Sequence, residues 1–211
     1  MATLEGTVGP TTQTTGSAGT AHYGWHGDFL VAQYSPRYAE LVGRNKVFAA
    51  ATAATGVAPG TAIGTTAAYA LYNPQGSGKN LAVLAASLGY VSGTLGAGVV
   101  HYIGHLSPSQ TAFTGTTITA RNCLLGNTAT GVGLAYTTAT VPASGSILGT
   151  FCSLQASLAS TAVAPWQVVE HLDGLLMIAP GGGVSIQATA AAGTSPLVII
   201  GLVWAEMDVL S

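Results

Sequence analysis

The fold class of this chain is decided by residues 68–105, AYALYNPQGSGKNLAVLAASLGYVSGTLGAGVVHYIGH. The stretch holds three apolar runs, at 68–72, 80–91 and 98–105, which are separated by two glycine-rich connectors. Because proline fixes φ and glycine permits φ > 0, the connectors favour turns, and Pro74 lies in the first of them. Each run has the length of a strand rather than a helix. The stretch is therefore predicted to be a β-meander.

Gly76-Ser77-Gly78-Lys79 is similar to the end of a phosphate-binding loop. Such a loop needs a glycine five residues before its Gly-Lys pair, and a Ser or Thr after the lysine to hold magnesium. Those two positions are Asn73 and Asn80 here. The segment is therefore interpreted as a turn, and no nucleotide cofactor is expected.

Composition suggests an assembly rather than a free monomer. A chain of 211 residues fits one all-β domain with an arm. Only 6% of its residues are charged, whereas about 25% are charged in ordinary soluble domains. A net charge of -2 gives little repulsion between copies, so a free monomer would be expected to self-associate. We infer an obligate assembly.

Charge and hydropathy also argue against two classes of partner. Arg37, Arg44 and Lys46 are the only cluster of basic residues, and they are interpreted as solvated charges. Nucleic-acid binding, which needs clustered Lys and Arg to neutralise phosphates, is not expected. The N-terminus lacks the pattern of a signal peptide. The longest apolar run, 197–205, is shorter than the ~20 residues of a membrane span, so the chain is expected to stay in a cytoplasm without a membrane partner.

The N-terminal part differs from the rest. Residues 1–27 are rich in Thr and Gly, and they end in an aromatic cluster that includes Tyr23, Trp25 and His26. This composition suits an extended arm that becomes ordered against another protein, although a plain disordered tail fits it equally well. The aromatic cluster favours docking, because aromatic residues are enriched at interfaces. Together with Tyr34 and Arg37, these three residues form the predicted partner interface.

A linker with more charge follows the arm, at residues 28–64. A short helix is expected around 38–42, between Pro36 and Gly43. Residues 47–54 fit a helix or a strand, since alanine leaves the periodicity ambiguous. The remaining residues, 65–211, are predicted to form one β-sandwich domain.

Further strands are expected after the central stretch. Short runs rich in β-branched and apolar residues alternate with Gly and Pro turns, and 197–209 is predicted to be a buried central strand. The count of eight to ten strands predicts an all-β, jelly-roll-like antiparallel β-sandwich with an extended N-terminal arm. The strand candidates in this part of the chain are 117–125, 135–141, 147–154, 166–172, 175–178, 184–189 and 197–209.

Histidines and cysteines give weak signals for chemistry. His101 and His105 are four residues apart, which in a strand places both on one face. Without a third ligand this spacing is weak for zinc, so both are interpreted as polar or interfacial residues, and His22 and His26 in the arm likewise. The two cysteines, Cys123 and Cys152, have neither disulfide nor metal spacing and are interpreted as small core residues.

Paired carboxylates are the remaining catalytic candidate. Glu170 and Asp173 could serve a glycosidase or depolymerase, which needs two carboxyl groups. In a strand, however, Glu170 and His171 point to opposite faces. Asp173 precedes Gly174, and such a pair is typical of a turn. No catalytic residue, cofactor, metal or small-molecule ligand is therefore predicted, and the protein is not expected to be an enzyme.

Several turn and strand motifs resemble a pattern found in virion structural proteins of tailed bacteriophages. These motifs are Leu71-Tyr72-Asn73-Pro74 with Gly76–Leu81, Gly93–Gly98, Asp173–Ile178 before Pro180-Gly181-Gly182, and Gly201–Glu206. The resemblance spans roughly residues 40–209 and carries fold rather than catalytic signatures. It implies a capsid cement or decoration protein, a jelly-roll homotrimer on the shell, made in the host bacterial cytoplasm and located on the virion. Its expected partner is the major capsid protein.

Three functions compete at this point. The first is the cement protein, which stabilises the shell against the pressure of packaged DNA. The second is a head-fibre or tail module that binds a host receptor, although no long repetitive shaft accompanies it. The third is the carbohydrate depolymerase.

Overall fold

The structure is a computed structural model, which describes residues 36–106, 112–143, 145–154, 167–189 and 193–209. Its contacts divide the chain into two units, residues 1–40 and 41–211. In the first unit, the described residues 36–40 form a turn in which Ala39 N–H donates to the Pro36 carbonyl at 2.9 Å. The short helix α1 (Ala39–Gly43) begins there, as the bracketing Pro36 and Gly43 predicted.

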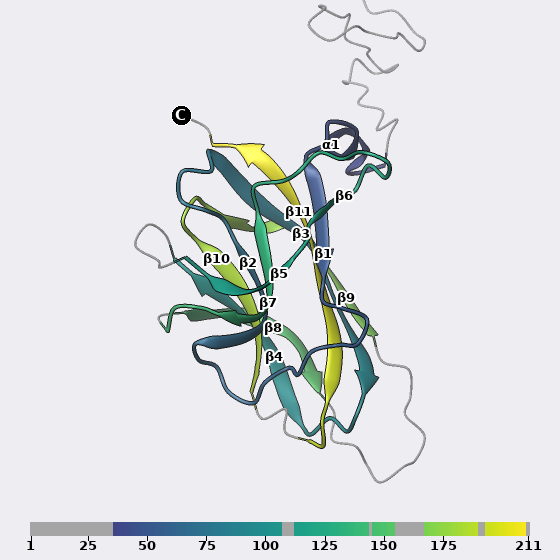
Figure 1. Ribbon diagram of the computed structural model, residues 1–211, viewed down its shortest axis with the longest axis vertical. Helices are drawn as coiled ribbons and strands as arrows, with labels where there is room; N and C mark the ends of the chain where they lie inside the picture. Colours follow the sequence, from purple (N-terminus) through teal and green to yellow (C-terminus); the bar gives the residue numbers. More distant parts are fainter. Residues whose placement is uncertain (1–35, 107–111, 144, 155–166, 190–192, 210–211) are drawn as a thin grey trace, which may run out of the picture. The chain divides into compact units, whose positions relative to one another are not determined.

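The second unit is an antiparallel β-sandwich, which confirms the predicted fold class. Among the described residues, strands make up 58% and helix 3%, and two sheets pack face to face (Figure 1). The strands are β1 (Val47–Ala51), β2 (Thr66–Tyr72), β3 (Lys79–Ser92), β4 (Gly98–His105), β5 (Thr114–Ile118), β6 (Arg121–Asn122), β7 (Leu134–Thr140), β8 (Ser146–Leu154), β9 (Gln167–Ile178), β10 (Gly183–Thr189) and β11 (Leu197–Asp208).

The order of strands in the sheets shows how the chain is wound. The five-stranded sheet has the order β6-β1-β11-β3-β9, and the six-stranded sheet has the order β5-β7-β2-β10-β4-β8. The chain changes sheet at every step from β1 to β4, and again from β8 to β11. Most neighbouring strands are thus far apart in the sequence, and β11 lies between β1 and β3 as the predicted central strand.

The predicted β-meander is wrong in its pairing, although its three strands exist. β2 and β4 belong to the six-stranded sheet, whereas β3 pairs with β11 and β9 in the other sheet. The first connector does reverse the chain, with positive φ at Gly76 and Gly78. A turn fixes the direction of the next strand, but the partner of β3 is chosen by burial of its apolar side against the opposite sheet.

The structure also decides where several of the expected strands begin and end. The ambiguous residues 47–54 contain strand β1, which pairs with β11 and β6, so part of the expected linker belongs to the sandwich. The run expected as one strand over 117–125 is divided between β5 and β6. The two candidates 166–172 and 175–178 form one strand, β9, whose irregularity coincides with positive φ at Asp173 and Gly174. Both residue types tolerate that conformation better than most.

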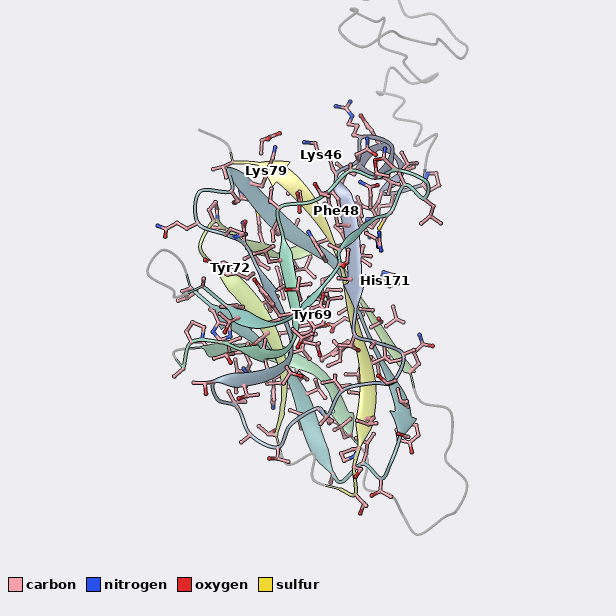
Figure 2. The ribbon with its side chains drawn as sticks, viewed as in Figure 1. Lys46, Phe48, Tyr69, Tyr72, Lys79 and His171 are labelled. Carbon is pink, nitrogen blue, oxygen red and sulfur yellow. The ribbon has the colours of Figure 1, made fainter. Side chains whose placement is uncertain are left out.

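The core lies between the two sheets. Its largest fully buried side chains include Trp204, Tyr69, Leu71 and Leu81. Tyr69 in the six-stranded sheet donates its hydroxyl to the carbonyl of Ala50 in the other sheet at 3.2 Å, which satisfies the one polar atom that its burial would leave unpaired. Phe48 and Tyr69 both contribute to this core (Figure 2).

Candidate functional site

The paired carboxylates considered for catalysis do not converge. Glu170 points into the sandwich, where the Tyr102 hydroxyl donates to its Oε2 at 2.7 Å. His171 is exposed on the other side of β9 (Figure 2), and Asp173 lies at φ 51° next to Gly174. The carboxylate of Glu170 thus joins the two sheets through a tyrosine, and its role in the described residues is structural.

Burial makes the two cysteines poor nucleophiles. Cys152 is half-buried against the core, and desolvation, with the nearby Glu170 carboxylate, raises the pKa of its thiol to about 11. Burial also raises the pKa of the Cys123 thiol. Because the thiolate is the reactive form, both thiols are unreactive at neutral pH. Both are half-buried rather than fully buried, as free cysteines at the margin of the core.

His101 and His105 lie on one face of β4, as their spacing predicted, and both are buried. Nε2 of His101 is 3.0 Å from Thr189 Oγ1, and Nε2 of His105 is 2.9 Å from Ser185 Oγ. Gln187 Nε2 donates to the same Ser185 oxygen at 3.0 Å, so the Ser185 hydroxyl bridges the side chains of His105 and Gln187. Among the described residues, no group of three or more His, Cys, Asp or Glu could hold a metal ion.

Burial of His105 gives a prediction for the pH dependence of stability. Desolvation lowers the pKa of His105, an effect that the Pro142 carbonyl only partly opposes. As the pH falls through about 6.5, the unfolded chain takes up the proton first, so stability should be complete above that pH and decline below it. In His105→Gln this decline should be reduced between pH 7 and pH 5, as measured by urea midpoints. The exposed His171→Gln is the control, and an unchanged decline in His105→Gln would exclude this cause.

The turn that was compared with a phosphate-binding loop has another role. Lys79 begins strand β3 rather than a helix, and its ammonium pairs with the exposed Asp208 carboxylate at the end of β11. Lys46 lies 3.8 Å from the same carboxylate, and both lysines are at the same end of the sandwich (Figure 2). This ion cluster is solvent-exposed and lies where Lys46, which precedes β1, meets the ends of β3 and β11.

The predicted partner interface is largely outside the described residues. Tyr23, Trp25, His26 and Tyr34 all fall there, as does His22. Arg37 is described, and its guanidinium lies 5.6 Å from the centre of the Tyr38 ring, a cation–π contact within the first unit. A role of these residues in docking stays a prediction.

The outer sides of the two sheets differ, and this difference marks the strongest candidate site. On the six-stranded sheet the chain covers its own outer side over strands β2 and β10. Phe113 stacks on Tyr72 at 5.0 Å, and Gly64 N–H donates to the side chain of Gln187 at 2.9 Å. Both Tyr72 and Gln187 are at most 5% exposed.

The outer side of the five-stranded sheet is partly open and carries few charges. On β9, Val169 and Met177 are 51% and 54% exposed, and they alternate with Val168, Leu176 and Ile178, which pack in the core. The same alternation turns half of β1, β3 and β11 outward. We call this surface the open face. Its exposed and half-buried members are Ala49, Ala51, Ala85, Ser87, Gly89, Val91, Val169, His171, Leu175, Met177, Ile199, Val203 and Met207.

The same side also carries two exposed charged residues, Asp173 between His171 and Leu175 on β9 and Arg121 of β6, which pairs with Ala49. Its most exposed apolar residue is Leu175, at 82%. Contiguous apolar surface of this kind marks interaction sites on soluble proteins. Sequence reasoning missed the open face, because it considered the two sides of the strand only at Glu170 and His171 and did not follow the outward side along 166–172 and 175–178. Core residues alternate strictly with outward residues along β9, and this alternation was the signal that could have revealed the open face.

None of the helices in the described part of the chain is long and apolar enough to cross a membrane. Comparison of the chain with protein-family models, with curated proteins and with solved structures finds no match in any of the three.

Proposed function

We propose that this protein is a capsid cement protein of a tailed bacteriophage, which binds the outer shell as a homotrimer and stabilises it against the pressure of packaged DNA. The observation that carries the proposal is the open face. One side of a sheet that carries few charges and several exposed apolar side chains suits contact with other protein surfaces. The polar groups of its interior, including Glu170 and His105, are engaged in structural hydrogen bonds.

The winding of the chain supports the finer fold assignment, a jelly roll. With β5, β6 and β7 set aside, eight strands remain. Numbered in chain order, they run first, eighth, third, sixth in one sheet and second, seventh, fourth, fifth in the other. Two interleaved Greek keys of eight strands in two sheets define a jelly roll. This architecture agrees with the virion structural proteins that the turn motifs resemble.

The proposed mechanism is mechanical. A trimer seated across junctions between capsid subunits adds apolar and backbone contacts, and each contact raises the free energy needed to open the shell. An interface of about 1,600 Å² is a standard specific one, and several contacts per trimer act together by avidity. With only 6% charged residues, binding should depend on shape and apolar burial and should survive high salt, which screens mainly exposed charges.

The test compares particles that contain the protein with particles that lack it. Particles without it should assemble but release DNA at a lower temperature, and adding back the purified protein should restore the release temperature. The measurement is DNA release on heating, at low and at high ionic strength. Equal release temperatures would refute shell stabilisation, and detachment by moderate salt alone would show an electrostatic interface. Location of the chain on a fibre or tail would favour the receptor-binding alternative.

A further inference from the structure

The open face is divided by residue size. The bulky exposed side chains are on the edge strand β9, and we call Val169, Leu175 and Met177 the rim. The strands β3, β11 and β1 carry mostly smaller outward residues, and we call this part the floor. It consists of the small residues Ala49 and Ala51 on β1, Ser87 and Gly89 on β3 and the buried Gly201 on β11, together with the larger Ile199 and Val203.

Glycine keeps the floor flat. A Cβ added at Gly201 would come within 2.9 Å of Ser87 Oγ and 3.3 Å of the Ala51 Cβ, so the three residues are packed side by side across β3, β11 and β1. A flat surface of small residues accepts bulky side chains from another surface without a steric clash. The rim has the complementary shape, because its three side chains are each at least half exposed.

The size and charge of the open face suit a protein partner. With about 3.3 Å per residue and about 4.8 Å between strands, β1, β11, β3 and β9 present a face on the order of 700 Å². A stable interface takes about 800 Å² from each partner, and the rim and the floor share the face between two contacts, so each single contact is smaller and gains from avidity when a ring closes. A partner must be similarly poor in charge there, because a charged group buried against the apolar part of this face would lose its hydration without a counter-charge. A second copy of the chain offers such a surface in the complementary shape.

The geometry points to self-association in which the rim of one copy packs on the floor of a second copy. Because the rim and the floor are different patches, this contact is heterologous, and heterologous contacts form a ring when the rotation between copies closes and an open filament when it does not. A ring of three copies would be the homotrimer of the proposed function. The number three rests on that proposal, whereas the contact of rim and floor does not.

The experiment replaces one rim residue in the full chain. Leu175→Glu should weaken self-association at least about 30-fold, because it buries a carboxylate at the centre of the contact. The matched control is Leu125→Glu, which changes a residue that is 90% exposed and lies outside the open face. Sedimentation velocity over a range of concentrations measures assembly, and urea unfolding checks that both variants remain folded. A wild-type monomer, or equal assembly of wild type and Leu175→Glu, would overturn the inference.

A floor variant tests the direction of the contact. Ala51→Glu alone should also dissociate the assembly. A mixture of Ala51→Glu and Leu175→Glu chains retains one intact rim and one intact floor, so it should form a complex of one chain of each. Absence of that complex would contradict packing of rim on floor.

Two further results separate this inference from the proposed function. A wild-type ring of another size that Leu175→Glu dissociates would support the contact but refute the homotrimer. Deletion of residues 1–35 should leave assembly unchanged. Dissociation by that deletion alone would make the N-terminal segment the connecting element instead. Shell stabilisation is measured on particles, so its failure would leave these results in solution intact.

Discussion

Replacing Glu206 with alanine should lower the free energy of unfolding by about 3–5 kcal/mol, since the change leaves several buried donors without an acceptor. Glu206 is 5% exposed, and its carboxylate accepts from Val132 N–H at 2.8 Å, from Gly133 N–H at 2.9 Å and from Trp204 Nε1 at 3.2 Å. These bonds fasten the segment before β7 to the end of the core. Conformation of that segment depends on them, because Gly133 is buried and cannot turn its N–H to water.

Two variants separate the hydrogen bonds from the charge. Glu206→Gln keeps one acceptor oxygen and should cost about 1–2 kcal/mol. Asp208→Asn changes an exposed carboxylate two residues further along β11 and should leave the urea midpoint nearly unchanged, since exposed ion pairs contribute little. Urea unfolding monitored by tryptophan fluorescence and by circular dichroism gives all three values. Equal urea midpoints for Glu206→Ala and Asp208→Asn would contradict the stabilising role of the Glu206 hydrogen bonds.

Asn73→Ala should cost about 2–4 kcal/mol, because Asn73 holds two turns together. Its side chain is fully buried, and Nδ2 donates to the carbonyls of Lys79 at 2.7 Å and of Ile178 at 2.9 Å. The Ser77 hydroxyl donates to its Oδ1 at 2.7 Å. One amide thus joins the connector between β2 and β3 to the end of β9, and alanine would remove this donor from the Ile178 carbonyl, whereas the Lys79 carbonyl keeps the Ser77 hydroxyl at 3.3 Å.

A carboxylate at the same position gives a sharper test. Asn73→Asp keeps the acceptor for Ser77 but places negative oxygens against two carbonyls, so it should destabilise at neutral pH at least as much as Asn73→Ala. Asn127→Ala is the matched control, since Asn127 is exposed and its Oδ1 accepts only from the nearby Ala129 N–H among the bonds that it makes in the described residues. Equal urea midpoints of Asn73→Ala and Asn127→Ala at pH 7 would contradict the prediction.

Local signals were sufficient for much of the fold. Turn residues such as Pro74 and Gly76 separate strands where they were expected, and the long apolar run before Asp208 is the central strand β11. The helix α1 lies where Pro36 and Gly43 bracket it. These features depend on φ preferences and side-chain periodicity within a few residues, which the sequence states directly.

The pairing of the strands and the exposed surface could not be predicted from these local signals. β3 was expected between β2 and β4, but its partners β9 and β11 lie about a hundred residues further along the chain. Asp173 and Gly174 were interpreted as a turn between strands, yet β9 continues through them. In both cases a local reversal or irregularity is compatible with several arrangements, and burial against distant strands selects one.

The sequence by itself determined an all-β chain of short strands, low charge and no obvious catalytic set, because composition and local periodicity carry that information. Only the tertiary structure decided which sides of the strands are covered. Tyr72 and Gln187 are buried under segments of the chain itself, whereas Leu175 and Met177, equally free of charge, are left exposed. Exposure depends on what packs over a residue in three dimensions, and segments that are distant in sequence supply that cover.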